Sequence, residues 1–142
     1  MSLTEGEKLL ITESFTKIAP LSDKVAGVFY KRLFEVAPDT KELFKNTNMT
    51  DQGRKMMQTI ATAVGAVYTL DAITPEMQAL GKRHMAYGVK AEQYDNIGEA
   101  LIWAMKESLG DEFPADTAAA WKKVYALIAD IAKAEHSKKQ GG

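Results

Sequence analysis

The segment Leu80–Leu101 has the sequence LGKRHMAYGVKAEQYDNIGEAL. Its apolar residues recur every three or four positions, which is the spacing of one face of an α-helix and not the alternation of a β-strand. His84 lies one helical turn after Leu80 and two turns after Met77, so its imidazole belongs to the same apolar face. A histidine in this setting is more often a hydrogen-bonded core residue than a metal ligand, so its role depends on the rest of the chain.

The same helical spacing continues through the rest of the sequence. Apolar residues share faces in three further sets: Val25, Phe29 and Leu33; Met56, Ile60, Val64 and Val67; and Trp121, Val124, Ile128 and Ile131. No stretch alternates with a period of two for long enough to predict a strand. The prolines precede or open helical patterns, where a missing amide hydrogen costs nothing; they are Pro20, Pro38, Pro75 and Pro114.

These patterns predict an all-α fold of about seven helices. Residues 1–142 would form one domain, with a frayed tail at His136–Gly142. Small residues within the predicted helices, Gly27, Gly65 and Gly98, suit close helix crossings at steep angles and disfavour a symmetric four-helix bundle.

Composition excludes several functional classes. The chain has 46% hydrophobic and 26% charged residues and a net charge of −1, so it lacks the basic excess that a nucleic-acid-binding protein needs. It contains no cysteine, which excludes disulfides, thiolate metal sites and a cysteine nucleophile. The longest uncharged run, Met56–Leu70, is shorter than the roughly 20 residues that cross a bilayer. With no signal peptide recognised at the N-terminus, we expect a cytoplasmic protein.

Most motifs for catalysis and metal binding are absent from the sequence. There is no glycine-rich dinucleotide fingerprint, no P-loop, no H-E-x-x-H pair and no EF-hand loop. Neither histidine has a glutamate three residues before it, which excludes the paired Glu-x-x-His motifs of di-iron bundles.

Four segments, in order, resemble the globins. Leu80–Leu101 resembles their proximal segment and is most similar to that of bacterial single-domain haemoglobins and of neuroglobin. Phe29–Phe44, FYKRLFEVAPDTKELF, is similar to the segment from the distal tyrosine to the haem-contact phenylalanine. Asp51–Gln58, DQGRKMMQ, resembles the start of the distal helix, and Ala119–Ile131, AAWKKVYALIADI, resembles the final helix. The resemblance covers the chain from about residue 9 to residue 131 and implies a globin fold around a haem pocket.

The resemblance implies that haem b is the cofactor and that His84 is its axial ligand. A neutral imidazole suits ferrous iron, and a single protein ligand leaves the sixth position open for a gas. The implied pocket walls are Phe44 and Met56 on the distal side, Leu80 and Val89 on the proximal side, and Ile97 deeper. Lys55 at the rim is expected to pair with a haem propionate. Ordinary core packing is the alternative for each apolar residue, and a solvated surface charge is the alternative for Lys55.

The matching segments place Tyr30 and Gln52 over the open iron site. A phenol O–H and an amide N–H both donate hydrogen bonds, and dioxygen gains partial negative charge when it binds haem iron. Such bonds contribute about 1.5–3 kcal/mol each, so losing one would weaken oxygen affinity about 10- to 150-fold. Alternatively, Tyr30 anchors two helices and Gln52 faces solvent.

Tyr94 matches a position where flavohaemoglobin-like proteins have a tyrosine that links the ligand histidine to a glutamate of the last helix. Such a relay makes the imidazole more anionic. Counted from Tyr125, the expected glutamate position is occupied by His136, and Glu135 lies one residue earlier. One residue turns a side chain by about 100° around a helix. A relay from Tyr94 to Glu135 therefore stays open, with packing beside the haem as the alternative for Tyr94.

Several functions fit this pocket. We favour reversible dioxygen binding for storage, transport or scavenging, in either a monomer or a homodimer. Nitric oxide dioxygenation is the enzymatic alternative, and it would need a separate reductase because 142 residues hold no flavin and nicotinamide domain. A haem-based sensor of diatomic gases would need a partner to read its ligand state. A helical interaction module without haem is the remaining alternative.

Overall fold

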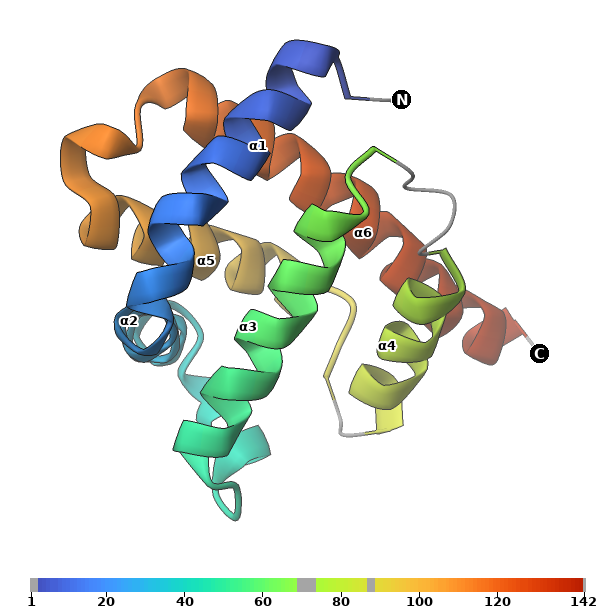
Figure 1. The fold of residues 1–142 in the computed structure, drawn as a ribbon. Helices are drawn as coiled ribbons and strands as arrows, with labels where there is room; N and C mark the ends of the chain where they lie inside the picture. Colours follow the sequence, from blue (N-terminus) through green and yellow to red (C-terminus); the bar gives the residue numbers. More distant parts are fainter. Residues whose placement is uncertain (1–2, 69–73, 87–88, 142) are drawn as a thin grey trace.

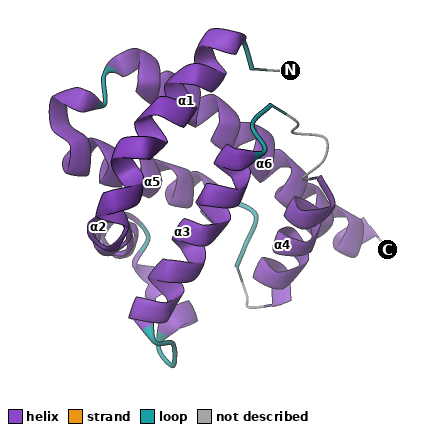
Figure 2. Ribbon diagram, viewed as in Figure 1, coloured by secondary structure: helices purple, strands orange, loops and turns teal. Residues whose placement is uncertain are grey.

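The computed structural model describes residues 3–68, 74–86 and 89–141. This part of the chain forms six α-helices and three short 3-10 helices and contains no strand (Figure 2). The α-helices are α1 (Glu5–Ile18), α2 (Ser22–Val36), α3 (Met49–Gly65), α4 (Thr74–Ala86), α5 (Gln93–Leu109) and α6 (Ala115–Gly141). The 3-10 helices are η1 (Ala19–Leu21), η2 (Pro38–Phe44) and η4 (Gly110–Glu112). The predicted all-α fold is confirmed, with part of its helical content in the tighter 3-10 form.

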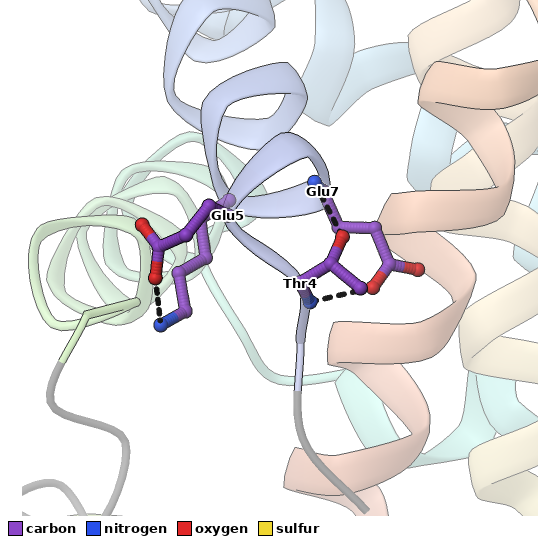
Figure 3. Close-up of polar contacts among 4 residues, drawn as sticks. Thr4, Glu5 and Glu7 are labelled. Carbon is purple, nitrogen blue, oxygen red and sulfur yellow. Dashed lines mark hydrogen bonds and ion pairs between the residues drawn. The ribbon is translucent and has the colours of Figure 1, made fainter.

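Polar side chains define where the first helices begin. Thr4 and Glu7 form a capping box at the start of α1 (Figure 3): the Thr4 hydroxyl accepts from the Glu7 amide at 3.1 Å, and the Glu7 carboxylate accepts from the Thr4 amide at 2.8 Å. Lys123 of α6 donates to the same carboxylate oxygen at 2.9 Å. Asn48 caps α3 by accepting from the Asp51 amide at 3.1 Å. The first turn of α1 is thereby fixed both to its own backbone and to α6.

The prolines lie at helix starts, as the sequence predicts. Pro20 and Pro38 lie in the first turns of η1 and η2, Pro75 lies in the first turn of α4, and Pro114 directly precedes α6. At the other end of the chain, α6 continues to Gly141, so the backbone of the expected tail is helical as far as this residue. The residues before Gly141 include no proline or glycine after Pro114, which leaves nothing in the sequence to end the helix earlier.

The helices pack in crossing pairs. The contacts of α4 are mainly with α6, and the two lie side by side at the C-terminal end of the molecule (Figure 1). The α2 helix packs on α5, and α3 packs on α2 and α1. The largest fully buried side chains gather between these pairs and include Ile11, Ile18, Val25, Met105 and Phe113. None of the helices in the described ranges has the length and apolar character needed to cross a membrane.

The glycines at helix crossings differ from those expected. A Cβ added at Gly27 or Gly65 would meet nothing within 4 Å, so the prediction of close crossings there is wrong. Close approaches occur instead at Gly81, which faces the backbone of α6, at Gly53, which faces α2, and at Gly98, which faces the Tyr125 ring. Only Gly98 was expected, because spacing along one helix does not show which of its faces meets another helix.

Candidate cofactor-binding site

A large cavity lies in the interior, with walls from all six α-helices and from η2. Its volume is about 900 Å³, at the upper end of the roughly 300–1,000 Å³ typical of sites for small molecules and cofactors. Of the predicted site residues, all but Glu135 line it: Tyr30, Phe44, Gln52, Lys55, Met56, Leu80, His84, Val89, Tyr94 and Ile97. The structure therefore brings together side chains that are spread over almost 70 residues of sequence.

His84 lies on α4 and is half-buried at the cavity wall. Its Nδ1 atom is 3.2 Å from the Tyr94 hydroxyl, and its backbone carbonyl accepts a hydrogen bond from the Val89 amide at 2.9 Å. Which partner donates in the His84–Tyr94 bond depends on the tautomer of the imidazole. The contact at Nδ1 orients the ring, so that Nε2 is the nitrogen that would coordinate a metal.

Tyr94 itself is held by a second tyrosine. The Tyr125 hydroxyl donates to the backbone carbonyl of Tyr94 at 2.6 Å, and the Tyr125 ring lies so close to Gly98 that a Cβ there would come within 2.6 Å of it. Burial raises the pKa of Tyr94 to about 12, and burial together with nearby Tyr94 and Asp95 raises the pKa of Tyr125 further. Both phenols are therefore protonated at neutral pH. This contact of Tyr125 with Tyr94 spans 31 residues and was not predicted from the sequence.

Glu135 is buried, with 5% of its surface exposed, although it does not line the cavity. It lies on α6 one turn after Ala132, which packs with Tyr94 in a small buried cluster and against Gly81 of α4. Its side chain therefore belongs to the region where α6 meets the proximal elements. The side chain of His136 lies outside the described residues, and the relay from Tyr94 to Glu135 stays a prediction.

On the opposite wall, Tyr30 of α2 is packed among aromatic rings. It is 8% exposed, and its ring centroid lies 5.4 Å from that of Phe44 and 6.1 Å from that of Phe34. Burial raises the pKa of the Tyr30 phenol, and a hydrogen bond with the Gln52 side chain offsets part of that rise. A phenol and a carboxamide can each donate and accept hydrogen bonds, so either side chain can also serve a further polar group in the cavity. Tyr30 and Gln52 thus form one polar pair in an apolar wall.

The remaining predicted residues complete the lining. Phe44 lies on η2, Met56 on α3, Leu80 on α4, Ile97 on α5, and Val89 in the segment before α5; all are partly buried. Lys55 is exposed at the α3 side of the cavity, and Arg83, which the sequence did not single out, is exposed at the α4 side. Two cations therefore stand at the rim of a mainly apolar cavity.

Gln93 is a further residue of the cavity, and it was not predicted from the sequence. Its buried carboxamide lines the cavity and bonds to the Lys90 amide at 2.8 Å and to the Asp39 carboxylate at 3.0 Å. The bond to Lys90 spans three residues at a helix start, which local spacing could suggest. The bond to Asp39 spans 54 residues and has no local signal.

Comparison with known proteins identifies the architecture. The family model for globins matches residues 27–132. The chain belongs to the globin family. A flavohemoprotein from Halalkalibacterium halodurans is 32% identical to this globin over 133 residues, and the match covers 92% of the chain but 32% of the relative. One from Oceanobacillus iheyensis is 35% identical over 105 residues, covering 72% of the chain and 26% of the relative. The globin thus spans about a third of the length of these relatives or less.

Solved structures share the fold of this globin. An engineered carbene transferase from Rhodothermus marinus, described as a candidate nitric oxide dioxygenase, superposes with a TM-score of 0.87 at 23% identity and covers 99% of this chain and 97% of its own. A hexacoordinated heme protein from an anhydrobiotic tardigrade superposes with a TM-score of 0.84 at 16% identity, with 94% of both chains covered. At these identities, the likeness shows the globin fold.

Membership of the family implies haem as the cofactor, and the residues of this globin fit that group. Haem iron needs an axial protein ligand, and His84 offers an imidazole oriented by Tyr94. The porphyrin needs a large apolar slot, which the lining of the cavity provides. Its carboxylates need cations or water, and Lys55 and Arg83 stand at the rim.

Proposed function

We propose that this globin holds haem b through His84 and binds dioxygen reversibly and with high affinity. The observation that carries the proposal is that Tyr30 and Gln52, whose side chains interact, line the same cavity as His84. Both side chains have N–H or O–H groups that can donate hydrogen bonds. Storage, transport and scavenging of oxygen would all use this pocket. Other diatomic gases would enter the same site.

The chemistry supplied by haem is an iron atom that binds the gas. The protein supplies the environment. The aromatic rings of Tyr30, Phe34 and Phe44 exclude water from the distal side, which strengthens any hydrogen bond made there. The Tyr30 phenol, kept protonated by its raised pKa, and the Gln52 amide donate to a polarised gas. Each such bond to a charged acceptor contributes about 1.5–3 kcal/mol.

The proximal side tunes the ligand. The Tyr94 hydroxyl at Nδ1 of His84 fixes the ring and adjusts how strongly the imidazole donates electrons. We propose that Glu135 acts together with Tyr94 in this role, which its burial beside the Ala132 cluster supports. Lys55 would pair with a haem propionate. Because Lys55 is exposed, that pair would contribute at most about 1 kcal/mol.

Nitric oxide dioxygenation is the second candidate. It is favoured by the flavohemoprotein relatives and by the contact between His84 and Tyr94. Conversion of one dioxygen and one nitric oxide to one nitrate ion would need one electron per turnover, since nitrate carries one negative charge more than the two gases. The match to the flavohemoprotein from Halalkalibacterium halodurans covers 32% of that relative's length, and we propose that a reductase would supply the electron. Steady nitrate production with a cellular reductant would favour this candidate over oxygen storage.

Two measurements test the proposal. Absorption spectra of the haem-loaded protein in its ferric, ferrous and oxygenated states report haem uptake and oxygen binding, and His84→Ala should abolish stable uptake. Tyr30→Phe should speed oxygen dissociation about 10- to 150-fold, because one donor is lost. Tyr68→Phe is the matched control, since the Tyr68 ring is 53% exposed and faces Lys8 at the surface. If oxygen dissociated from Tyr30→Phe at the same rate as from Tyr68→Phe, Tyr30 would not be a hydrogen-bond donor to the bound oxygen.

A further inference from the structure

The carboxamide of Gln93 bonds in two directions at the first residue of α5. Its Nε2 atom donates to Oδ2 of Asp39 at 3.0 Å, and its Oε1 atom accepts from the Lys90 amide at 2.8 Å. The side chain is 5% exposed and lines the cavity. A buried amide that uses both its donor and its acceptor is held in one orientation.

The two partners are exposed residues, and each is next to a residue that lines the cavity: Asp39 precedes Thr40, and Lys90 follows Val89. Asp39 lies in η2, the 3-10 helix that ends at Phe44 of the distal wall. Next to it, Thr40 is almost fully buried and donates to the Ala37 carbonyl at 2.7 Å, which fixes this end of η2.

Lys90 follows Val89, whose amide donates to the His84 carbonyl at 2.9 Å. Gln93 thus binds Lys90, and Lys90 directly follows the residue whose amide contacts His84. The side chain of Gln93 therefore joins the segment at Val89–Lys90 to Asp39 of η2.

We propose that Gln93 is a positioning residue that holds the distal segment Pro38–Phe44 and the proximal segment at Val89–Lys90 at a fixed separation, and so slows the loss of haem. This inference rests on the proposed binding of haem. The segments belong to different elements, η2 and the connection before α5, so hydrogen bonds within each segment do not set the distance between them. A short polar link across the two therefore sets how wide the slot opens on this side.

The test exchanges the donor and the acceptor of the Gln93–Asp39 bond. In Gln93→Glu, one carboxylate oxygen still accepts from the Lys90 amide, but the other faces the Asp39 carboxylate and repels it. In the double variant Gln93→Glu with Asp39→Asn, the new amide of residue 39 donates to the new carboxylate of residue 93. The link is restored with its polarity reversed. Asn46→Asp is the control for added charge, because Asn46 is an exposed amide outside the lining of the cavity.

The measurement is the rate at which the ferric, haem-loaded protein transfers haem to excess apomyoglobin, with circular dichroism to confirm that each variant is folded. We expect Gln93→Glu to raise the transfer rate about tenfold or more, given the strength of hydrogen bonds to charged groups. The double variant should return close to the transfer rate of the unmodified protein, and Asn46→Asp should leave that rate unchanged. A residue that merely stabilises the fold would not be rescued by the exchange.

The outcomes separate this inference from the proposed function. Transfer rates within about twofold for all variants, or a double variant as fast as Gln93→Glu, would overturn the role of Gln93 and leave haem binding intact. An unmodified protein that takes up no haem would overturn both. Rescue by the double variant would establish the link between the two walls.

Discussion

Replacement of Gly81 by alanine should push α4 away from α6. A Cβ built on Gly81 lies 2.5 Å from the Ala132 carbonyl oxygen and 2.9 Å from its Cα atom, whereas ordinary van der Waals contact begins at 3.4 Å. The difference between 3.4 and 2.5 Å, about 0.9 Å, is the displacement that the two helices must absorb. The atoms in the way are backbone, so no side chain can rotate to relieve the contact.

Two opposing effects determine how much Gly81→Ala changes the free energy of unfolding. Alanine is favoured over glycine inside a helix by about 1 kcal/mol, and overpacking of this kind typically costs about 1–3 kcal/mol. Gly27→Ala is the matched control, because a Cβ at Gly27 in α2 meets nothing within 4 Å. We therefore expect Gly27→Ala to stabilise the protein by about 1 kcal/mol and Gly81→Ala to lie about 1–3 kcal/mol below that control.

Urea unfolding of the two variants, followed by circular dichroism, measures this difference. Gly81 is also three residues before His84, so the displaced helix should carry the imidazole with it. We expect faster haem transfer from Gly81→Ala and an unchanged rate from Gly27→Ala. If Gly81→Ala stabilised the protein as much as Gly27→Ala does, the argument from the close approach of α4 and α6 would be refuted.

Three further predictions follow from the buried polar groups. The contribution of Tyr94 to the free energy of unfolding should be fully present below pH 10 and be lost as the pH rises towards about 12, because folded Tyr94 keeps a proton that an unfolded tyrosine releases. Urea unfolding at alkaline pH measures how steeply this free energy falls with pH, and Tyr94→Phe should make the fall less steep. Tyr125→Phe should cost about 1 kcal/mol through loss of the 2.6 Å bond to the Tyr94 carbonyl, and equal urea midpoints would contradict this. Trp121→Phe should cost about 1–3 kcal/mol, because it removes the bond from the indole to Ser14. In a double-mutant cycle, Ser14→Ala should destabilise the Trp121→Phe variant less than it destabilises the unmodified protein.

Much of the fold is determined by local patterns that the sequence displays. The three-and-four spacing of apolar residues predicts α-helices, and four prolines mark where helices begin. Residues of the cavity could be named because the motifs of the resemblance are local too: His84 on α4, Tyr30 on α2 and Gln52 on α3 each belong to a short segment. Matching the segments in order was enough to predict which side chains would line one cavity.

Contacts that depend on how helices cross could not be found in this way. Gly27 and Gly81 look alike in the sequence, yet Gly27 borders open space and Gly81 borders the backbone of Ala132. The Gln93–Asp39 bond joins residues 54 positions apart, and its geometry depends on where η2 comes to lie. For Glu135, counting along α6 placed the expected position one residue later, yet the side chain is buried. Helix register alone does not determine what a neighbouring helix covers.

The two walls of the cavity belong to different packing units, and this explains why links between them matter. On the proximal side, α4 packs mainly on α6, whereas on the distal side α3 packs on α2 and α1. The separation of the two walls is therefore set indirectly, through the contacts of α6 with α5 and α1 and of these two helices with α2 and α3. A small shift at Gly81 moves one wall without moving the other. A bound porphyrin would contact both walls directly. We therefore expect haem binding to stabilise the protein chiefly by holding together the two walls, which few direct contacts of the polypeptide connect.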